Sequence, residues 1–281
     1  MTKSKKDTVV FIVEGEKLDV QIMQEICTHF IPSIKKGILV HGTHIYSLYN
    51  QLKKDDFATD IIELLKERSD EEELNNLNSE DVSEIYLFFD FDGHNYQDRS
   101  DGENIALSEI EEMLQCFNNE TENGKLYLSY PMIESIFHLD KTDFDKGKAL
   151  TLKTFYAFSG RDKAGKHYKK ISGVIDSYYK KTKNSLYSEA DWNFILHYFL
   201  CCLMNLFEQQ EFIEYKVYRQ MISPEAVFEQ QKDKYIMKAK KILVLNGYPQ
   251  FIIDYFGNVL YEKLILQLGD YPADVKIIDI E

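Results

Sequence analysis

The stretch Tyr86-Leu-Phe-Phe-Asp90-Phe-Asp92-Gly-His-Asn95 decides the fold. Ile85–Phe89 is an apolar run of strand length, typical of a strand buried on both faces of a mostly parallel sheet. Asp90 and Asp92 follow it two residues apart, so both carboxylates should face one spot at the carboxyl end of the strand. They repel each other unless a cation lies between them, which predicts a Mg²⁺ or Mn²⁺ site. The alternative is a solvated strand end.

A second strand, Thr8–Val13, is rich in β-branched residues and ends in Glu14-Gly15. A helix over 19–30 should follow, because Ile22, Met23 and Ile26 form an apolar stripe. Glu14 is thus a further carboxylate at a strand end. The alternative for Glu14 is a charge favoured by the N-terminus of that helix.

Strands and helices then alternate up to about residue 140. Strands are expected at 37–41 and 125–130, and helices at 45–52, 60–68 and 103–117. Pro131 should start another helix at its favoured first position, with Glu134 in the first turn beside a strand end. This order predicts an α/β domain over 1–140 with a mostly parallel sheet flanked by helices.

Strand signals stop after residue 140, so the rest, 141–281, is expected to be an all-α domain. Ser188-Glu-Ala-Asp191 has the form of a capping box ahead of a buried helix over 192–207. His197 in that helix is interpreted as a core histidine. Further helices are expected from Ser223-Pro224 to about Leu245 and over 249–268, and an edge strand over 275–280.

One local basic patch stands out in a chain of formal net charge −14. Tyr156, Phe158 and Tyr168 lie among its cations, an interleaving that suits phosphate contact with base stacking. A solvated helix start and loop is an equally good interpretation. The basic residues are Arg161, Lys163, Lys166, Lys169 and Lys170.

Composition limits the classes of protein. The negative charge argues against non-specific coating of nucleic acid, but not against a local basic groove. No segment approaches the ~18 apolar residues of a membrane span, so no membrane association is expected. The four cysteines form no CxxC pair, and we interpret Cys201 and Cys202, adjacent in an apolar helix, as core thiols of a cytoplasmic protein.

A strand ending in Glu14-Gly15, followed by a later strand ending in Asp90-Phe-Asp92, resembles the Toprim domain of topoisomerases, primases and OLD-type nucleases. The resemblance covers residues 8–140 and is strongest to small Toprim nucleases of bacterial antiphage defence. It implies an endonuclease with Mg²⁺ or Mn²⁺ held by Glu14, Asp90 and Asp92. We add Glu134 as a fourth ligand from its strand-end position, and Lys163 or Lys166 to steady the phosphate.

Such a nuclease would act on DNA or RNA. Its activity would need a partner, such as a separately encoded ATPase or sensor, a viral trigger or a homodimer.

Two other functions remain open. Asp90-Phe-Asp92-Gly93 also resembles the first motif of haloacid-dehalogenase-type phosphatases, in which Asp90 would be the nucleophile. In a phosphatase of this type, Ser129 and the segment 269–274 would supply the later motifs of the family. His94 stands where that family has threonine. The other possibility is a non-catalytic Toprim scaffold for a partner ATPase.

Overall fold

The structure, a computed structural model, describes residues 7–66, 77, 79–91, 103–139, 149–151, 168, 187–209, 211–239 and 241–267. The chain divides into two compact units. The first contains Met1–Asp90 and Asn104–Tyr127, and the second contains Phe91–Glu103 and Leu128–Glu281. The expected boundary at residue 140 falls outside the described residues and stays a prediction.

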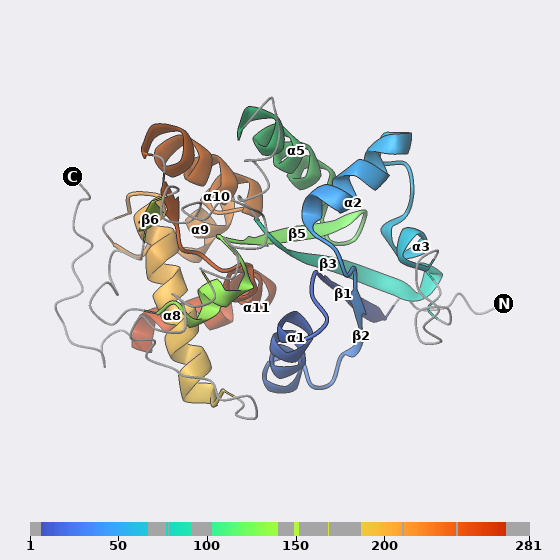
Figure 1. Cartoon of the computed structure of the whole chain (residues 1–281). Helices are drawn as coiled ribbons and strands as arrows, with labels where there is room; N and C mark the ends of the chain where they lie inside the picture. The colour runs from blue at the N-terminus through green and yellow to red at the C-terminus, as the bar shows by residue number, and fades with distance from the viewer. Residues whose placement is uncertain are drawn as a thin grey trace. The chain divides into compact units, whose positions relative to one another are not determined.

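The main sheet has five strands in the order β2-β1-β3-β5-β4 (Figure 1). β1 pairs in parallel with both β2 and β3, whereas β4 is antiparallel to β5, so the sheet is mostly parallel, as predicted. The strands are β1 (Thr8–Val13), β2 (Lys35–Val40), β3 (Val82–Asp90), β4 (Asn118–Asn119) and β5 (Gly124–Ser129). β4 and β5 therefore form a short hairpin.

β1 lies in the interior of this sheet, and all six of its residues are buried. Strands flank β1 on both edges and helices cover both faces of the sheet (Figure 1), so neither face of the strand is left to solvent. The register with β2 is regular, whereas the register with β3 shifts between Thr8 and Val9. Val13 at the end of β1 lies opposite Val40 of β2 and Phe88 of β3.

Helices cover both faces of the sheet in the first unit. α1 (Leu18–His29) lies on one side, and α2 (Ile45–Leu52) and α5 (Glu103–Cys116) lie on the other (Figure 1). The contact between α2 and α5 includes Glu112, whose carboxylate accepts hydrogen bonds from Tyr49 at 3.0 Å and from Lys53 at 2.8 Å. With α3 (Ile61–Lys66), these helices confirm the predicted α/β alternation.

The second unit is mostly helical. The capping box at Ser188 is confirmed, with Asp191 at the third position of α8 (Glu189–Leu206), and Trp192 and His197 of this helix are buried. The other helices are α9 (Tyr215–Met221), α10 (Pro224–Gln230), the π-helical η5 (Gln231–Met237) and α11 (Gly247–Gln267).

Two expectations about the second unit were wrong. The helix expected from Ser223 to Leu245 ends early, because β7 (Lys241–Leu243) pairs antiparallel with β6 (Ala149–Thr151). The physical reason is the buried side chain of Gln231, which donates to the carbonyl of Leu243 at 2.7 Å and accepts from its N–H at 3.1 Å. The C-terminal half is therefore not all-α.

The helix expected to start at Pro131 was also wrong. The segment forms a short 3₁₀ helix, η4 (Ile133–Phe137), preceded by Met132. Asn246 donates to the carbonyl of Ile133 at 3.0 Å, and Ser135 donates to the carbonyl of Leu245 at 2.8 Å. The first contact occupies the carbonyl of Ile133, which an α-helix would use within itself, and both contacts join the segment to a distant part of the chain.

Cys201 and Cys202 are buried in α8, which confirms their interpretation as core residues. None of the helices in the described part of the chain is long and apolar enough to cross a bilayer.

Candidate active site

Glu14 and Asp90 lie at the carboxyl ends of adjacent parallel strands. Asp90 is the last residue of β3, and Glu14 directly follows β1. From β1 the chain passes to β2, which lies on one side of β1 in the sheet. It then returns to β3, which lies on the other side of β1. A crevice opens at the carboxyl ends where successive connections leave a sheet in opposite directions, and open α/β sheets bind ligands there. Both predicted carboxylates therefore flank this switch point.

The side chain of Glu14 completes the hydrogen bonding between β1 and β3. The backbone N–H of Glu14 donates to the carbonyl of Phe88 at 3.1 Å, as the parallel ladder requires. The backbone carbonyl of Glu14 turns away from β3 and accepts from the N–H of Gly42, which follows β2, at 3.0 Å. The next N–H of β3, that of Asp90, donates to Oε2 of Glu14 at 3.0 Å. The Glu14 carboxylate is thus held beside Asp90 by a backbone contact.

The glycine that follows Glu14 leaves room for another acid. A Cβ atom at Gly15 would lie 2.6 Å from Oδ2 of Asp19, so the Asp19 side chain would have to shift to admit a larger residue. Asp19 lies in the first turn of α1 and is 7% exposed. A carboxylate there is favoured by the helix dipole. Glycine at position 15 therefore lets the Asp19 carboxylate lie close to the turn from β1 into α1.

His41 follows β2 at the same edge of the sheet and is 6% exposed. Its ring packs edge-on against Phe89, with 5.4 Å between ring centroids. The backbone N–H of His41 donates to the carbonyl of Val13 at 2.8 Å. Sequence reasoning placed His41 at the end of a strand but gave it no role, although a strand end was the signal used for Glu14.

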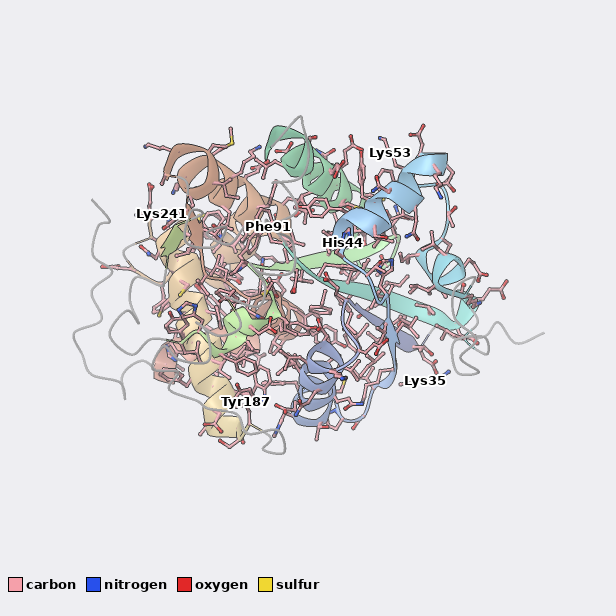
Figure 2. All side chains as sticks on the ribbon, in the orientation of Figure 1. Lys35, His44, Lys53, Phe91, Tyr187 and Lys241 are labelled. Carbon is pink, nitrogen blue, oxygen red and sulfur yellow. The ribbon has the colours of Figure 1, made fainter. Side chains whose placement is uncertain are left out.

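A second histidine in the same loop has a structural role. His44 precedes the first turn of α2 (Figure 2), and its Nδ1 accepts a hydrogen bond from the N–H of Ser47 at 3.2 Å. An acceptor at this position satisfies one of the N–H groups that a helix start leaves without an intrahelical partner. His44 is thus the N-cap of α2.

Glu134 lies in η4 of the second unit and is 9% exposed. That Glu134 lies in one cluster with Glu14 and Asp90 stays a prediction. Ser129, weighed as part of a phosphatase motif, is buried, and its hydroxyl accepts from the N–H of Gly247 at 3.3 Å. Asp92, Arg161, Lys163, Lys166, Lys169, Lys170 and the segment 269–274 lie outside the described residues. Tyr168 is buried against His138, with Oη 3.1 Å from Nδ1.

The donor atoms suit a hard divalent cation. Carboxylate oxygens are the ligands that Mg²⁺ and Mn²⁺ prefer, and Glu14 and Asp90 are both partly buried. Within the ranges that the structure describes, no three His, Cys, Asp or Glu side chains form a group able to hold a metal ion. Glu14 and Asp90 of the expected set lie at adjacent strand ends, and Asp92 is the predicted third.

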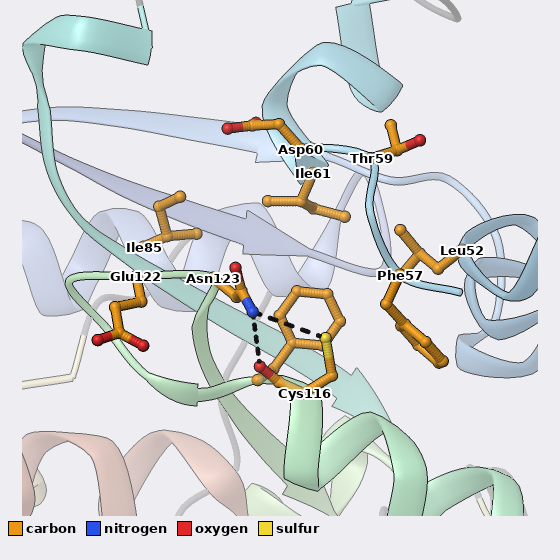
Figure 3. Close-up of a pocket in the computed structure, with 10 residues that line it drawn as sticks. Leu52, Phe57, Thr59, Asp60, Ile61, Ile85, Cys116, Glu122 and Asn123 are labelled. Atoms are coloured by element: carbon orange, nitrogen blue, oxygen red, sulfur yellow. Dashed lines mark hydrogen bonds between the residues drawn. The ribbon is translucent and has the colours of Figure 1, made fainter. Parts of the chain in front are cut away.

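A small cavity of about 30 Å³ lies elsewhere in the first unit (Figure 3). It has room for about one water molecule. Asn123 donates to the carbonyl of Cys116 at 3.3 Å beside it, and burial raises the pKa of the Cys116 thiol. Ile85 lines it, five residues before Asp90 along β3, so the cavity is distinct from the carboxyl edge. The lining residues are Leu52, Phe57, Thr59, Asp60, Ile61, Ile85, Cys116, Phe117, Glu122 and Asn123.

No family model, no curated protein and no solved structure matches this chain.

Proposed function

We propose that the protein is a Mg²⁺- or Mn²⁺-dependent nuclease of the Toprim type that cleaves phosphodiester bonds in DNA or RNA. The observation that carries the proposal is the hydrogen bond from the Asp90 N–H to the Glu14 carboxylate at 3.0 Å. It joins the carboxylate of Glu14 to the backbone of Asp90 at the switch point of the sheet, where α/β proteins bind ligands. The Toprim resemblance assigns metal binding to these same positions.

In this proposal Glu14, Asp90 and Asp92 hold the divalent ion, with Glu134 as an additional ligand. A bound divalent ion would polarise the phosphate and lower the pKa of a water molecule. Lys166, or Lys163, would stabilise charge on the phosphate, and the whole patch from Arg161 to Lys170 would hold the nucleic acid backbone. The biological role we propose is that of an effector in bacterial antiphage defence, released by a partner ATPase or sensor.

The test uses substitutions that preserve the backbone contact. Glu14→Gln retains a carbonyl oxygen that can accept from Asp90 and removes only the negative charge. Glu16→Gln is the matched control, because Glu16 is exposed two residues away. We expect Glu14→Gln and Asp90→Asn to lose at least about 100-fold in cleavage rate with Mg²⁺ or Mn²⁺, and Glu16→Gln to lose none. Calorimetry with Mn²⁺ should give weaker binding for the first two variants.

The assay should contain linear DNA, single-stranded RNA and a small phosphomonoester, each with the full chain. Cleavage that survives Glu14→Gln would refute the proposed metal role of Glu14. Turnover of the phosphomonoester that depends on Asp90 and not on Glu14 would replace the nuclease by a phosphatase. Turnover of none of the three substrates, with or without a candidate partner, would favour a non-catalytic scaffold.

A further inference from the structure

A second basic stretch lies in the second unit and reads Lys234-Tyr-Ile-Met-Lys238-Ala-Lys-Lys241. Four of its eight residues are lysine and none is acidic, in a chain with 47 acidic and 33 basic residues. A helix up to Leu245 was expected over this stretch, and its charges were given no role. In the structure the stretch contains the end of η5 and the start of β7 instead.

The lysines of this stretch differ in what they contact. Nζ of Lys234 lies 2.7 Å from a carboxylate oxygen of Glu208 and donates to the carbonyl of Leu206 at 2.9 Å. The pairing with Lys234 lowers the pKa of Glu208 and neutralises its negative charge. Lys238 and Lys241 are both exposed, and within the described ranges neither forms a salt bridge. These two charges are therefore available to an anion from solution.

Lys238 and Lys241 lie close enough together to contact phosphates of one strand. Lys238 caps the C-terminal end of η5, and Lys241 (Figure 2) is the first residue of β7. They are three residues apart, so their Cα atoms are separated by at most about 11 Å. Met237, directly before Lys238, is one of four large apolar side chains exposed in the described part of the chain. Cations beside an exposed apolar side chain suit a strand in which phosphates alternate with sugars and bases.

The pairing of β6 with β7 relates this surface to the predicted basic patch. Thr151, the last residue of β6, lies opposite Lys241. The chain therefore leaves β6 beside Lys241. In the sequence Arg161 follows Thr151 by ten residues and begins the patch that ends at Lys170.

We propose that Lys238 and Lys241, which we call the η5–β7 cations, bind the phosphate backbone of the nucleic acid substrate. This inference rests on the proposed nuclease function. A protein of net charge −14 repels phosphate at long range, so binding of a nucleic acid needs local cations that no acid of the protein neutralises. The η5–β7 cations supply two such contacts in addition to the predicted patch. They add affinity without sequence preference, because phosphate contacts carry no information about the bases.

The test removes the two charges together. The double variant Lys238→Gln/Lys241→Gln is compared with Lys35→Gln/Lys54→Gln, which removes two exposed lysines of the first unit and changes the net charge equally. The probes are a fluorescent single strand of DNA, the same strand in RNA and a DNA duplex. Anisotropy is measured with the full chain across a salt series, in EDTA so that no strand is cut.

The expected effect follows from counterion release. Loss of two phosphate contacts should reduce the slope of log affinity against log salt concentration by about 1.4 for a single strand and about 1.8 for a duplex. At about 0.1 M salt the affinity for the single strand should then fall about 25-fold. The control variant should change both quantities much less. Lys238→Arg/Lys241→Arg keeps both charges and should retain the affinity and the slope.

A structural role of Lys238 gives a different result. A cation at the C-terminal end of a helix is favoured by the helix dipole. If this is its only role, Lys238→Gln/Lys241→Gln will melt at a lower temperature but bind with the affinity and salt slope of the control variant. That result would overturn the inference. Melting curves of all variants check that each is folded at the temperature of the binding assay.

Other outcomes also decide the inference. Absence of binding by the unmodified protein to all three probes at low salt would overturn it. Unchanged nucleic acid binding with a loss of sedimentation onto vesicles of anionic lipid would assign the η5–β7 cations to a membrane surface instead. Loss of cleavage in Glu14→Gln with unchanged binding in Lys238→Gln/Lys241→Gln would refute this inference alone. Full cleavage in Glu14→Gln would refute the proposed function, whatever the binding assay gives.

Discussion

Burial of His197 in α8 makes the stability of the protein depend on pH. The side chain is 1% exposed, and its burial lowers the pKa of the imidazole from 6.5 to about 4. The folded state therefore resists protonation of a group that the unfolded state protonates near pH 6.5. Because the unfolded state binds more protons in this range, stability falls as the pH drops from about 6.5 towards 4.

The size of the effect follows from the two pKa values. With 6.5 in the unfolded and about 4 in the folded state, His197 should remove about 2 kcal/mol of unfolding free energy between pH 7 and pH 5. The substitution His197→Met removes the titrating group and retains an apolar side chain. The variant should therefore lose about 2 kcal/mol less than the unmodified protein over the same pH change.

The assay is urea unfolding at pH 7 and pH 5, followed by tryptophan fluorescence. The chain has one tryptophan, Trp192, which is fully buried in the same helix as His197, so the signal reports on the relevant unit. His29→Gln is the control, because His29 is an exposed histidine in the last turn of α1. Equal loss of stability with pH in the unmodified protein and in His197→Met would contradict the reasoning.

Two further predictions concern stability. Gly124→Ala should cost about 2 to 3 kcal/mol in thermal or urea unfolding, because Gly124 has φ +111° and its added Cβ would lie 2.7 Å from Leu87 Cδ1. The control Gly37→Ala, where a Cβ meets nothing within 4 Å, should cost much less, and equal costs would refute the steric explanation. Gln231→Leu should cost about 2 to 4 kcal/mol, because it removes the side-chain partner of both backbone groups of Leu243. A loss below the error of a urea unfolding curve would show that β7 does not need this contact.

The parallel half of the fold was predictable because its signals are local. The run Thr8–Val13 is buried along its whole length and apolar from Val9 onwards, and helix stripes follow it at regular spacing. The pair β6 and β7 was not predictable in this way. Each strand has three residues, and β7 is held by Gln231, ten residues before its first residue, Lys241. Tertiary contacts outweigh the helix propensity of the segment that contains β7.

The candidate site was predictable to a similar extent. Glu14 and Asp90 were found because charged residues directly after buried strands are visible in the sequence. The hydrogen bond between them depends on the turn of the Glu14 carbonyl towards Gly42, which no local pattern encodes. Spacing gives the residues of a site, whereas their hydrogen-bond partners follow from the folded backbone.

The interior position of β1 has a consequence for synthesis of the protein. β1 is the earliest described strand to leave the ribosome, and one of its two partners, β3, follows only after α1, β2, α2 and α3. Until then an apolar strand with an unpaired edge is available to other nascent chains, a condition that favours aggregation. We therefore expect soluble yield to depend on chaperone supply and on the rate of translation between Val13 and Val82 more than on changes at the surface of the finished fold.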